Sequence, residues 1–160
     1  MGDSVKRTAL SEMEELIRAK LQEGGTVTFS PKGRSMLPML RDKGDSVTLT
    51  KPPARLKKGM VALFISEDGN GKNYTLHRLV RTRGGRYVFM GDNRRNADAP
   101  VEHGSVLGVM TEFETRGEKH SVKEPLYRAY SFWMVSTTGV RRFASKVQNF
   151  ILGIRKKIRK

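Results

Sequence analysis

The feature that most limits the fold is an unbroken run of apolar residues near the middle of the chain, Met60-Val61-Ala62-Leu63-Phe64-Ile65. Turn-forming segments rich in glycine and charged residues border it, at residues 56–59 and 67–72. A continuous apolar run of this length between turn signals is typical of a strand that is buried on both faces. The run therefore predicts a strand in the interior of a sheet.

Other short segments carry the β-branched and aromatic residues that favour strands. They are residues 26–29, 46–50, 74–80, 87–90 and 105–110. Glycine, proline and polar residues separate them, as expected for turns. Short strands in this arrangement predict a mainly β fold, a single partly closed antiparallel β domain flanked by helices.

A Gly84-Gly85 pair lies between two of these segments and predicts a tight hairpin. If the two glycines form a two-residue loop, counting outward places His77 opposite Asp92. A loop that differs by one residue would place His77 opposite Met90 instead. Both registers stay open from the sequence.

Two segments have helical periodicity. Residues 8–23 carry apolar side chains at intervals of three and four, which is the pattern of an amphipathic helix, and Gly24-Gly25 ends it. Helical periodicity returns from Tyr127 onward, with an apolar face formed by Val140, Phe143, Val147, Phe150, Ile151, Ile154 and Ile158. The sequence therefore divides into an N-terminal helix (1–25), a β domain (26–124) and a basic C-terminal segment (125–160).

The charge of the chain is strongly positive, +15 over 160 residues. Glu124 is the last acidic residue, and nine basic residues follow it: Arg128, Arg141, Arg142, Lys146, Arg155, Lys156, Lys157, Arg159 and Lys160. Basic residues interleaved with an apolar face favour either a helix docked on the protein core or one lying on an anionic membrane surface. Without base-reading geometry, such a tail gives nucleic acid only nonspecific affinity, so no specific nucleic acid partner is expected.

The composition also argues against several classes of protein. There is no cysteine, and His77, His103 and His120 have no metal-ligand spacing, so we expect neither a metal nor a cofactor. No segment has the roughly 20 apolar residues of a membrane-spanning helix, and the N-terminal residues are too charged for a signal peptide. We therefore expect a cytoplasmic protein, either free or peripheral on the membrane.

The segment most suggestive of chemistry is Gly33-Arg34-Ser35-Met36-Leu37-Pro38. Gly33 can supply a positive φ, and Pro38 restricts the backbone of the residue before it. Met36 and Leu37 would anchor this stiff bend in the core and leave the Ser35 hydroxyl exposed as a nucleophile. The alternative is a surface turn that closes over two core residues.

A serine hydroxyl needs a base within hydrogen-bond reach and an acid to orient that base. His77, on a predicted strand, is the leading candidate for the base, although a strand histidine can be purely structural. The loop after the hairpin supplies two acids, Asp92 and Asp98. The hairpin register alone favours Asp92, which could instead be a turn former.

The order of these motifs resembles that of the serine peptidases that include signal peptidase I and the self-cleaving SOS repressors. The matching segments are the Ser35 bend, Gly44-Asp45, His77-Arg78 and Gly91-Asp92-Asn93. The histidine resembles the endoplasmic-reticulum variant of signal peptidase, in which a second acid follows the first by six residues. This resemblance implies that Asp98 orients His77, that Asp92 supports the site, and that the domain has the signal-peptidase fold.

The resemblance implies a serine endopeptidase that cleaves an extended peptide or leader segment through Ser35, His77 and Asp98. The resemblance covers roughly residues 26–113. We expect neither the membrane anchors of bacterial signal peptidases nor the helix-turn-helix domain of SOS repressors. Two alternatives remain. One is a non-catalytic peptide-binding or regulatory module with the same fold, and the other is a basic protein that binds nucleic acid.

Overall fold

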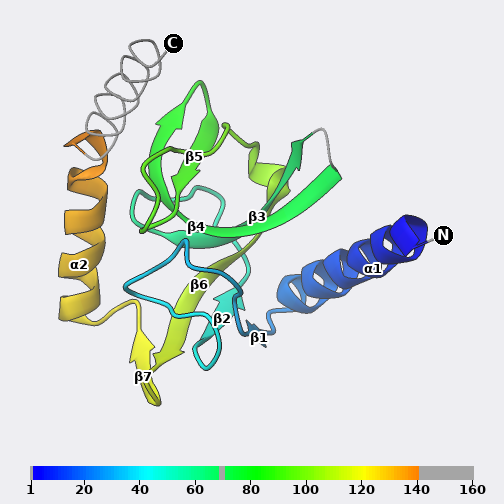
Figure 1. Cartoon of the computed structure of the whole chain (residues 1–160), viewed down its shortest axis with the longest axis horizontal. Coiled ribbons are helices and arrows are strands. Elements are labelled where there is room, and N and C mark those ends of the chain that lie inside the picture. The colour runs from blue at the N-terminus through cyan, green and yellow to red at the C-terminus, as the bar shows by residue number, and fades with distance from the viewer. Residues whose placement is uncertain (1, 69–70, 141–160) are drawn as a thin grey trace, which may run out of the picture.

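The computed structural model describes residues 2–68 and 71–140 and is built on one antiparallel β-sheet (Figure 1). The strands follow the order β1-β2-β6-β3-β4-β5, and β7 pairs with β6 beside this path. The elements are α1 (Gly2–Gln22), β1 (Val27–Phe29), β2 (Ser46–Thr50), β3 (Val61–Asp68), β4 (Gly71–Arg83), β5 (Arg86–Met90), a 3-10 turn (His103–Ser105), β6 (Val106–Thr115), β7 (Glu118–Ser121) and α2 (Pro125–Ser136). The predicted mainly β, antiparallel fold with a helix at either side is therefore confirmed.

The sheet is open, so the predicted partial closure is wrong. β1 and β5 stand at the two ends of the strand order and are not hydrogen-bonded to each other. The outer edge of β5 is instead occupied by the loop that follows it, because Tyr87 and Val101 exchange backbone hydrogen bonds of 2.9 Å in both directions. The Asp98 N–H also donates to the Phe89 carbonyl at 2.8 Å. A loop that satisfies this edge leaves no ladder for a closing strand.

The apolar run at residues 60–65 forms most of β3, and both faces of this strand are buried as predicted. Val61, Leu63 and Ile65 belong to one core cluster, whereas Ala62 and Phe64 belong to a second cluster on the other face. The strand pairs with β4 on one side and β6 on the other. It is therefore the interior strand on which both halves of the core are built.

The β4–β5 hairpin has the expected two-residue turn, with Arg83 paired to Arg86. The register then shifts by one residue between Leu79 and Arg81, so that Arg78 lies opposite Met90. This bulge overturns both predicted partners of His77, because each prediction assumed an unbroken ladder.

β7 was not predicted, and β6 extends five residues beyond its predicted end at residue 110. The β7 residues Glu118–Ser121 are all polar, so they lack the apolar alternation by which a strand is recognised. A turn at Arg116 and Gly117, both with positive φ, joins the two strands. β7 pairs with β6 at the register Glu112 to Ser121, and the His120 ring stacks on Phe113 with a centroid distance of 5.2 Å.

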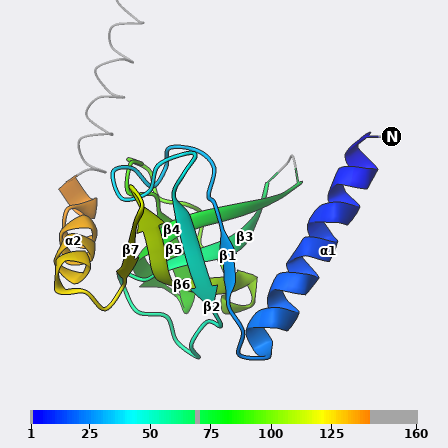
Figure 2. The ribbon, with the colours of Figure 1, turned by 90° about the horizontal axis from the view of Figure 1, so that it is seen from below.

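The two helices flank the sheet at opposite ends of the molecule (Figures 1 and 2), and Leu21 of α1 and Tyr127 of α2 join the same core cluster. α1 contacts the core through its C-terminal end, where Leu21 is buried, while Leu16 one turn earlier is exposed. α2 packs against the core through Tyr127, Ser131 and Met134, which are all buried. None of the helices in the described ranges has the length and apolar character needed to cross a bilayer.

The C-terminal helix predicted from Tyr127 onward corresponds to α2, which begins two residues earlier, at Pro125. The apolar face predicted beyond Val140 lies outside the described residues. Within the described residues, α2 therefore packs on the core through one face and leaves Leu126, Phe132 and Trp133 exposed.

Candidate active site

The Ser35 bend has the local structure that its sequence predicts. Gly33 has a φ of +95°, and a side chain added there would meet no atom within 4 Å, so the glycine serves the backbone conformation rather than a close contact. Met36, Met39 and Leu40 are buried and anchor the bend in the core. Anchoring therefore comes from Met36 as expected, but from the residues after Pro38 rather than from Leu37, which is only half-buried.

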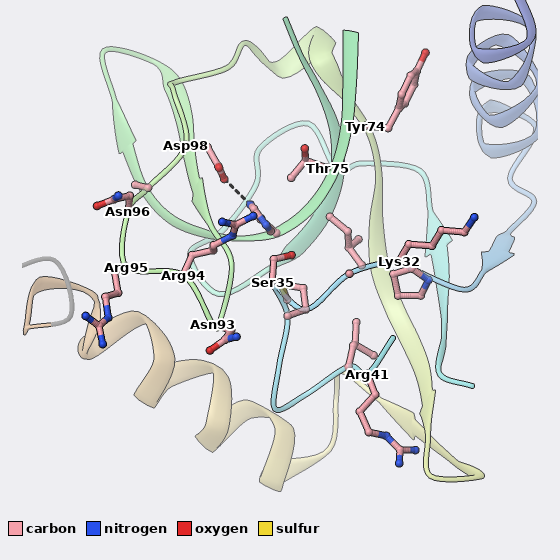
Figure 3. A pocket seen from close by; sticks show the side chains of 17 residues that line it. Lys32, Ser35, Arg41, Tyr74, Thr75, Asn93, Arg94, Arg95, Asn96 and Asp98 are labelled. Carbon is pink, nitrogen blue, oxygen red and sulfur yellow. Dashed lines mark hydrogen bonds and ion pairs between the residues drawn. The ribbon is translucent and has the colours of Figure 1, made fainter. Parts of the chain in front are cut away.

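Ser35 is half-buried and lines an open cleft with a volume of about 720 Å³. Residues of the bend, of β4 and of the loop after β5 form its walls. Figure 3 shows Ser35 in the middle of this cleft, with Asp98 on one side and a dashed line from Asp98 to the imidazole of His77. The structure thus brings three of the four predicted site residues, Ser35, His77 and Asp98, to one cleft.

His77 is held still by its surroundings. Its side chain is only 7% exposed, and its backbone pairs with Ala62 of β3. Its Nδ1 lies 2.6 Å from Oδ2 of Asp98, and its ring centroid lies 6.3 Å from that of Phe64. A carboxylate that accepts from Nδ1–H leaves Nε2 unprotonated and able to accept a proton.

Gly91 shows where the other ring nitrogen points. A Cβ placed on Gly91 would lie 2.9 Å from His77 Nε2 and 2.6 Å from the Ser35 carbonyl oxygen. Both atoms therefore border the space that a side chain at position 91 would occupy. Nε2 faces the serine bend while Nδ1 faces Asp98, and any side chain at position 91 would push the histidine and the bend apart.

Two hydrogen bonds attach the loop after β5 to the serine bend. The Asn93 N–H donates to the Ser35 carbonyl at 2.8 Å, and Asn93 Nδ2 donates to the Arg34 carbonyl at 3.1 Å. The same loop carries Asp98, whose N–H is bonded to β5. The loop after β5 thus positions the Asp98 carboxylate, Gly91 beside His77 and the backbone of Ser35.

Asp92, the fourth predicted site residue, is not among the residues that line the cleft, and it pairs with Arg78. Its carboxylate accepts from Arg78 Nε at 2.8 Å and from Arg78 Nη2 at 2.7 Å, in a bidentate pair with both side chains 1% exposed. The Tyr130 hydroxyl donates to the same carboxylate at 2.9 Å. The predicted hairpin register, which favoured Asp92 as the orienting acid, is therefore wrong. The bulge in β4 shifts the register, and Asp92 pairs with Arg78, the residue after His77.

Arg78 entered the sequence analysis only as part of the His77-Arg78 segment, without a role of its own. Burial disfavours its charge, but the ion pair with Asp92 outweighs that cost and raises the pKa of Arg78 above its usual value. Its Nη1 donates to the Gly59 carbonyl at 2.9 Å and to the Ser131 hydroxyl at 2.9 Å. The sequence did indicate a role for Arg78, because it lies in a strand segment that is apolar apart from His77. A buried arginine requires a buried anion as its partner.

Asp45, from the Gly44-Asp45 motif, supports the far end of the serine bend. Burial raises the pKa of its carboxyl, but hydrogen bonds from Arg41 and from the Thr115 hydroxyl outweigh burial and lower that pKa to about 2. The carboxylate accepts from the Arg41 backbone N–H at 2.7 Å and from its guanidinium at 2.9 Å. Asp45 therefore ties the end of the bend to β6 without reaching the cleft.

The cleft has the parts of a nucleophilic site, although no hydrogen bond joins the Ser35 hydroxyl to His77 within the described chain. Such bonds are often long without substrate and shorten when a substrate binds. The Ser35 N–H donates to no acceptor in the same part of the chain, so it is available to an oxyanion. Among residues 12–67 and 71–140, no group of three or more histidine and acidic side chains is placed to hold a metal ion.

Comparison with the sequence profiles of known protein families finds no family that matches this chain, and comparison with curated proteins finds no matching relative. The chemistry of the site therefore has to be argued from its own geometry.

Proposed function

We propose that this protein is a serine endopeptidase of the signal-peptidase-like class, with Ser35 as nucleophile, His77 as general base and Asp98 as the acid that orients the base. The observation that carries the proposal is the placement of His77. Its Nδ1 is bonded to Asp98, and its Nε2 faces the serine bend, inside one open cleft. This arrangement supplies the three roles that acyl transfer to a serine requires.

In this proposal the Ser35 hydroxyl attacks the carbonyl carbon of the peptide bond while His77 Nε2 accepts the hydroxyl proton. The tetrahedral intermediate expels the amine, which takes that proton from Nε2, and an ester on Ser35 remains. Water then attacks the ester and gives a proton to Nε2. Breakdown of the second intermediate releases the acid, and the proton returns to Ser35. Asp98 stays ionised and stabilises the imidazolium throughout.

The edge of β4 supports binding of the substrate as an extended strand. Thr75 and Leu76 line the cleft and pair with β3, while β5 pairs with β4 only from Arg78 onward. No second strand of the described chain pairs with this part of β4. A peptide that adds to this edge would pass beside Ser35, and its alternate side chains would point into the cleft.

The absence of a Ser35–His77 hydrogen bond favours one alternative, a module that binds peptides without cleaving them. A fluorophosphonate probe separates the two functions, because it labels only an activated serine. If the protein is a peptidase, mass spectrometry should find the probe on Ser35 in the full chain and should find no label at His77→Ala. An unlabelled full chain would favour the binding module.

Cleavage should depend on pH in the manner of a histidine base. We expect kcat/KM to fall as the solution is made acidic, because only an unprotonated imidazole accepts the serine proton. His77→Ala should lower the rate nearly as much as loss of the nucleophile, as members of one catalytic unit do. The pH profile of a cleaved peptide measures this. A His77→Ala variant with full activity and the same profile would contradict the assignment.

We propose that the outer face of α2 binds an anionic membrane surface. Its residues Leu126, Phe132 and Trp133 are 82%, 75% and 58% exposed, which is unusual for large apolar side chains. Three basic residues, Lys57, Lys58 and Arg128, line a groove together with Phe132. Aromatic side chains among cations are the pattern of a helix that lies in a membrane interface.

Substitution of both aromatic residues, Phe132→Ser with Trp133→Ser, should weaken sedimentation with phosphatidylserine vesicles by about tenfold, because apolar burial is lost while the charge is kept. Added salt should weaken binding of the unaltered protein without abolishing it. Leu16→Ser is the matched control, since Leu16 is 71% exposed but lies on α1 across the molecule. Equal binding by all three proteins would rule out the α2 face.

A further inference from the structure

The walls of the Ser35 cleft carry a large excess of positive charge. Four cationic side chains line it, namely Lys32, Arg41, Arg94 and Arg95, whereas Asp98 is the one acidic side chain among its lining residues. The Asp98 carboxylate is already bonded to His77. The charge a substrate meets in this cleft is therefore positive.

Nearby acids neutralise only part of that charge. Asp45 pairs with Arg41 at 2.9 Å. No ion pair with a described acid involves Lys32 or Arg94. Both of these side chains are exposed to the cleft, where an incoming anion can reach them.

The cations lie on both sides of the nucleophile. Figure 3 shows Lys32 and Arg41 on one side of Ser35 and Arg94 and Arg95 on the other. Their backbones are fixed relative to Ser35, because Lys32 precedes it by three residues and Asn93, next to Arg94, is bonded to the Ser35 carbonyl. A peptide that crosses Ser35 in either chain direction passes cations before and after the reacting bond.

We infer that the cleft selects acidic peptides, with Asp or Glu on both sides of the bond presented to Ser35. Cleavage of such peptides rests on the proposed peptidase function. Their preferential binding depends only on the charge of the cleft. Carboxylates would pair with Lys32 and Arg94 as the peptide displaces water, and a basic peptide would be repelled by the same side chains.

A peptide fits these observations better than a nucleic acid. Proteins that bind single strands without sequence preference combine a basic groove with several aromatic platforms on which the bases stack. Tyr74 is the one tyrosine, phenylalanine or tryptophan among the residues that line the cleft. The strand edge at Thr75 and Leu76 offers backbone pairing, which a peptide can use and a nucleotide cannot.

The test uses the full chain with Ser35→Ala, which cannot cleave, and two fluorescent peptides that differ only by Glu→Gln at positions flanking the central residue. Fluorescence anisotropy should show about tenfold tighter binding of the acidic peptide at low salt, since each exposed ion pair contributes modestly and two act together. The preference should shrink as salt is raised. Adding Lys32→Gln and Arg94→Gln should bring the two affinities close to each other.

Arg55→Gln is the matched control, because Arg55 is exposed and does not line the cleft. It should leave the preference unchanged. Equal affinity for the two peptides, or a preference that survives Lys32→Gln with Arg94→Gln, would overturn the inference. So would a single-stranded oligonucleotide of equal charge that binds more tightly than the acidic peptide and loses affinity in the same double variant.

Cleavage by the unaltered chain is measured separately, on a peptide library digested from a whole proteome. If acidic peptides bind but none is cut, the peptidase proposal fails while the preference stands. If peptides are cut without enrichment of Asp or Glu around the cleaved bond, the preference fails while the peptidase proposal stands.

Discussion

Replacing Ser35 with alanine should lower kcat/KM for a cleaved peptide by at least about a thousandfold, because the covalent route through the serine ester is lost. The fold should be unaffected. Ser35 lies at the cleft surface, and its hydroxyl makes no hydrogen bond within the described chain, so its removal neither opens a core cavity nor leaves a partner unpaired. Peptide cleavage followed by mass spectrometry measures the first effect, and thermal unfolding by circular dichroism measures the second.

Ser30→Ala is the matched control for this experiment. Ser30 is exposed, lies five residues before Ser35 and does not line the cleft. It should therefore retain full activity and the same unfolding temperature. Activity of Ser35→Ala close to that of Ser30→Ala would show that Ser35 is a turn residue and that the nucleophile has been misassigned.

The parts of the fold that the sequence predicted are those in which the pattern of burial is local. The run at residues 60–65 and the alternation at residues 46–50 each occur within one strand, so hydrophobic periodicity was enough to find them. The open sheet was not predictable in this way. The open edge depends on the pairing of Val101 with Tyr87. Val101 lies in a loop whose sequence has no strand pattern, so this pairing could not be predicted.

The site residues likewise differ in whether a local sequence pattern was enough to predict them. Ser35 and His77 stand in short motifs that carry their own signal, and the structure places them on the same cleft. Asp98 was ranked above Asp92 by the resemblance, whereas the counted hairpin register chose Asp92. The predicted register was wrong because of a one-residue bulge between Leu79 and Arg81. The residue types in that segment do not indicate a bulge.

The cationic residues of the cleft could not be predicted from the sequence for a different reason. Lys32, Arg94 and Arg95 are ordinary surface residues in sequence, within a chain that carries 31 lysines and arginines. The two hydrogen bonds from Asn93, to the Ser35 and Arg34 carbonyls, bring the segments that hold them together. Their proposed role in choosing a substrate therefore follows from the three-dimensional structure and not from the sequence.

Replacing Arg78 with alanine should lower the free energy of unfolding by about 3–5 kcal/mol, which is the usual cost of removing one partner from a buried ion pair. The Asp92 carboxylate would stay buried without its bidentate donor, and the Gly59 carbonyl and Ser131 hydroxyl would each lose a hydrogen bond. The transition temperature should fall by roughly 10 °C or more for a domain of this size. Urea unfolding followed by circular dichroism gives the free energy directly.

Arg83→Ala is the matched control, since Arg83 is an exposed residue of the same strand and should change stability by less than about 0.5 kcal/mol. A second variant tests the cause of the loss. Arg78→Met combined with Asp92→Leu removes both charges and should recover part of the stability, because no uncompensated charge stays buried. If that double variant is as unstable as Arg78→Ala, the loss comes from packing against Tyr127 and Tyr130, and the buried charge is not its cause.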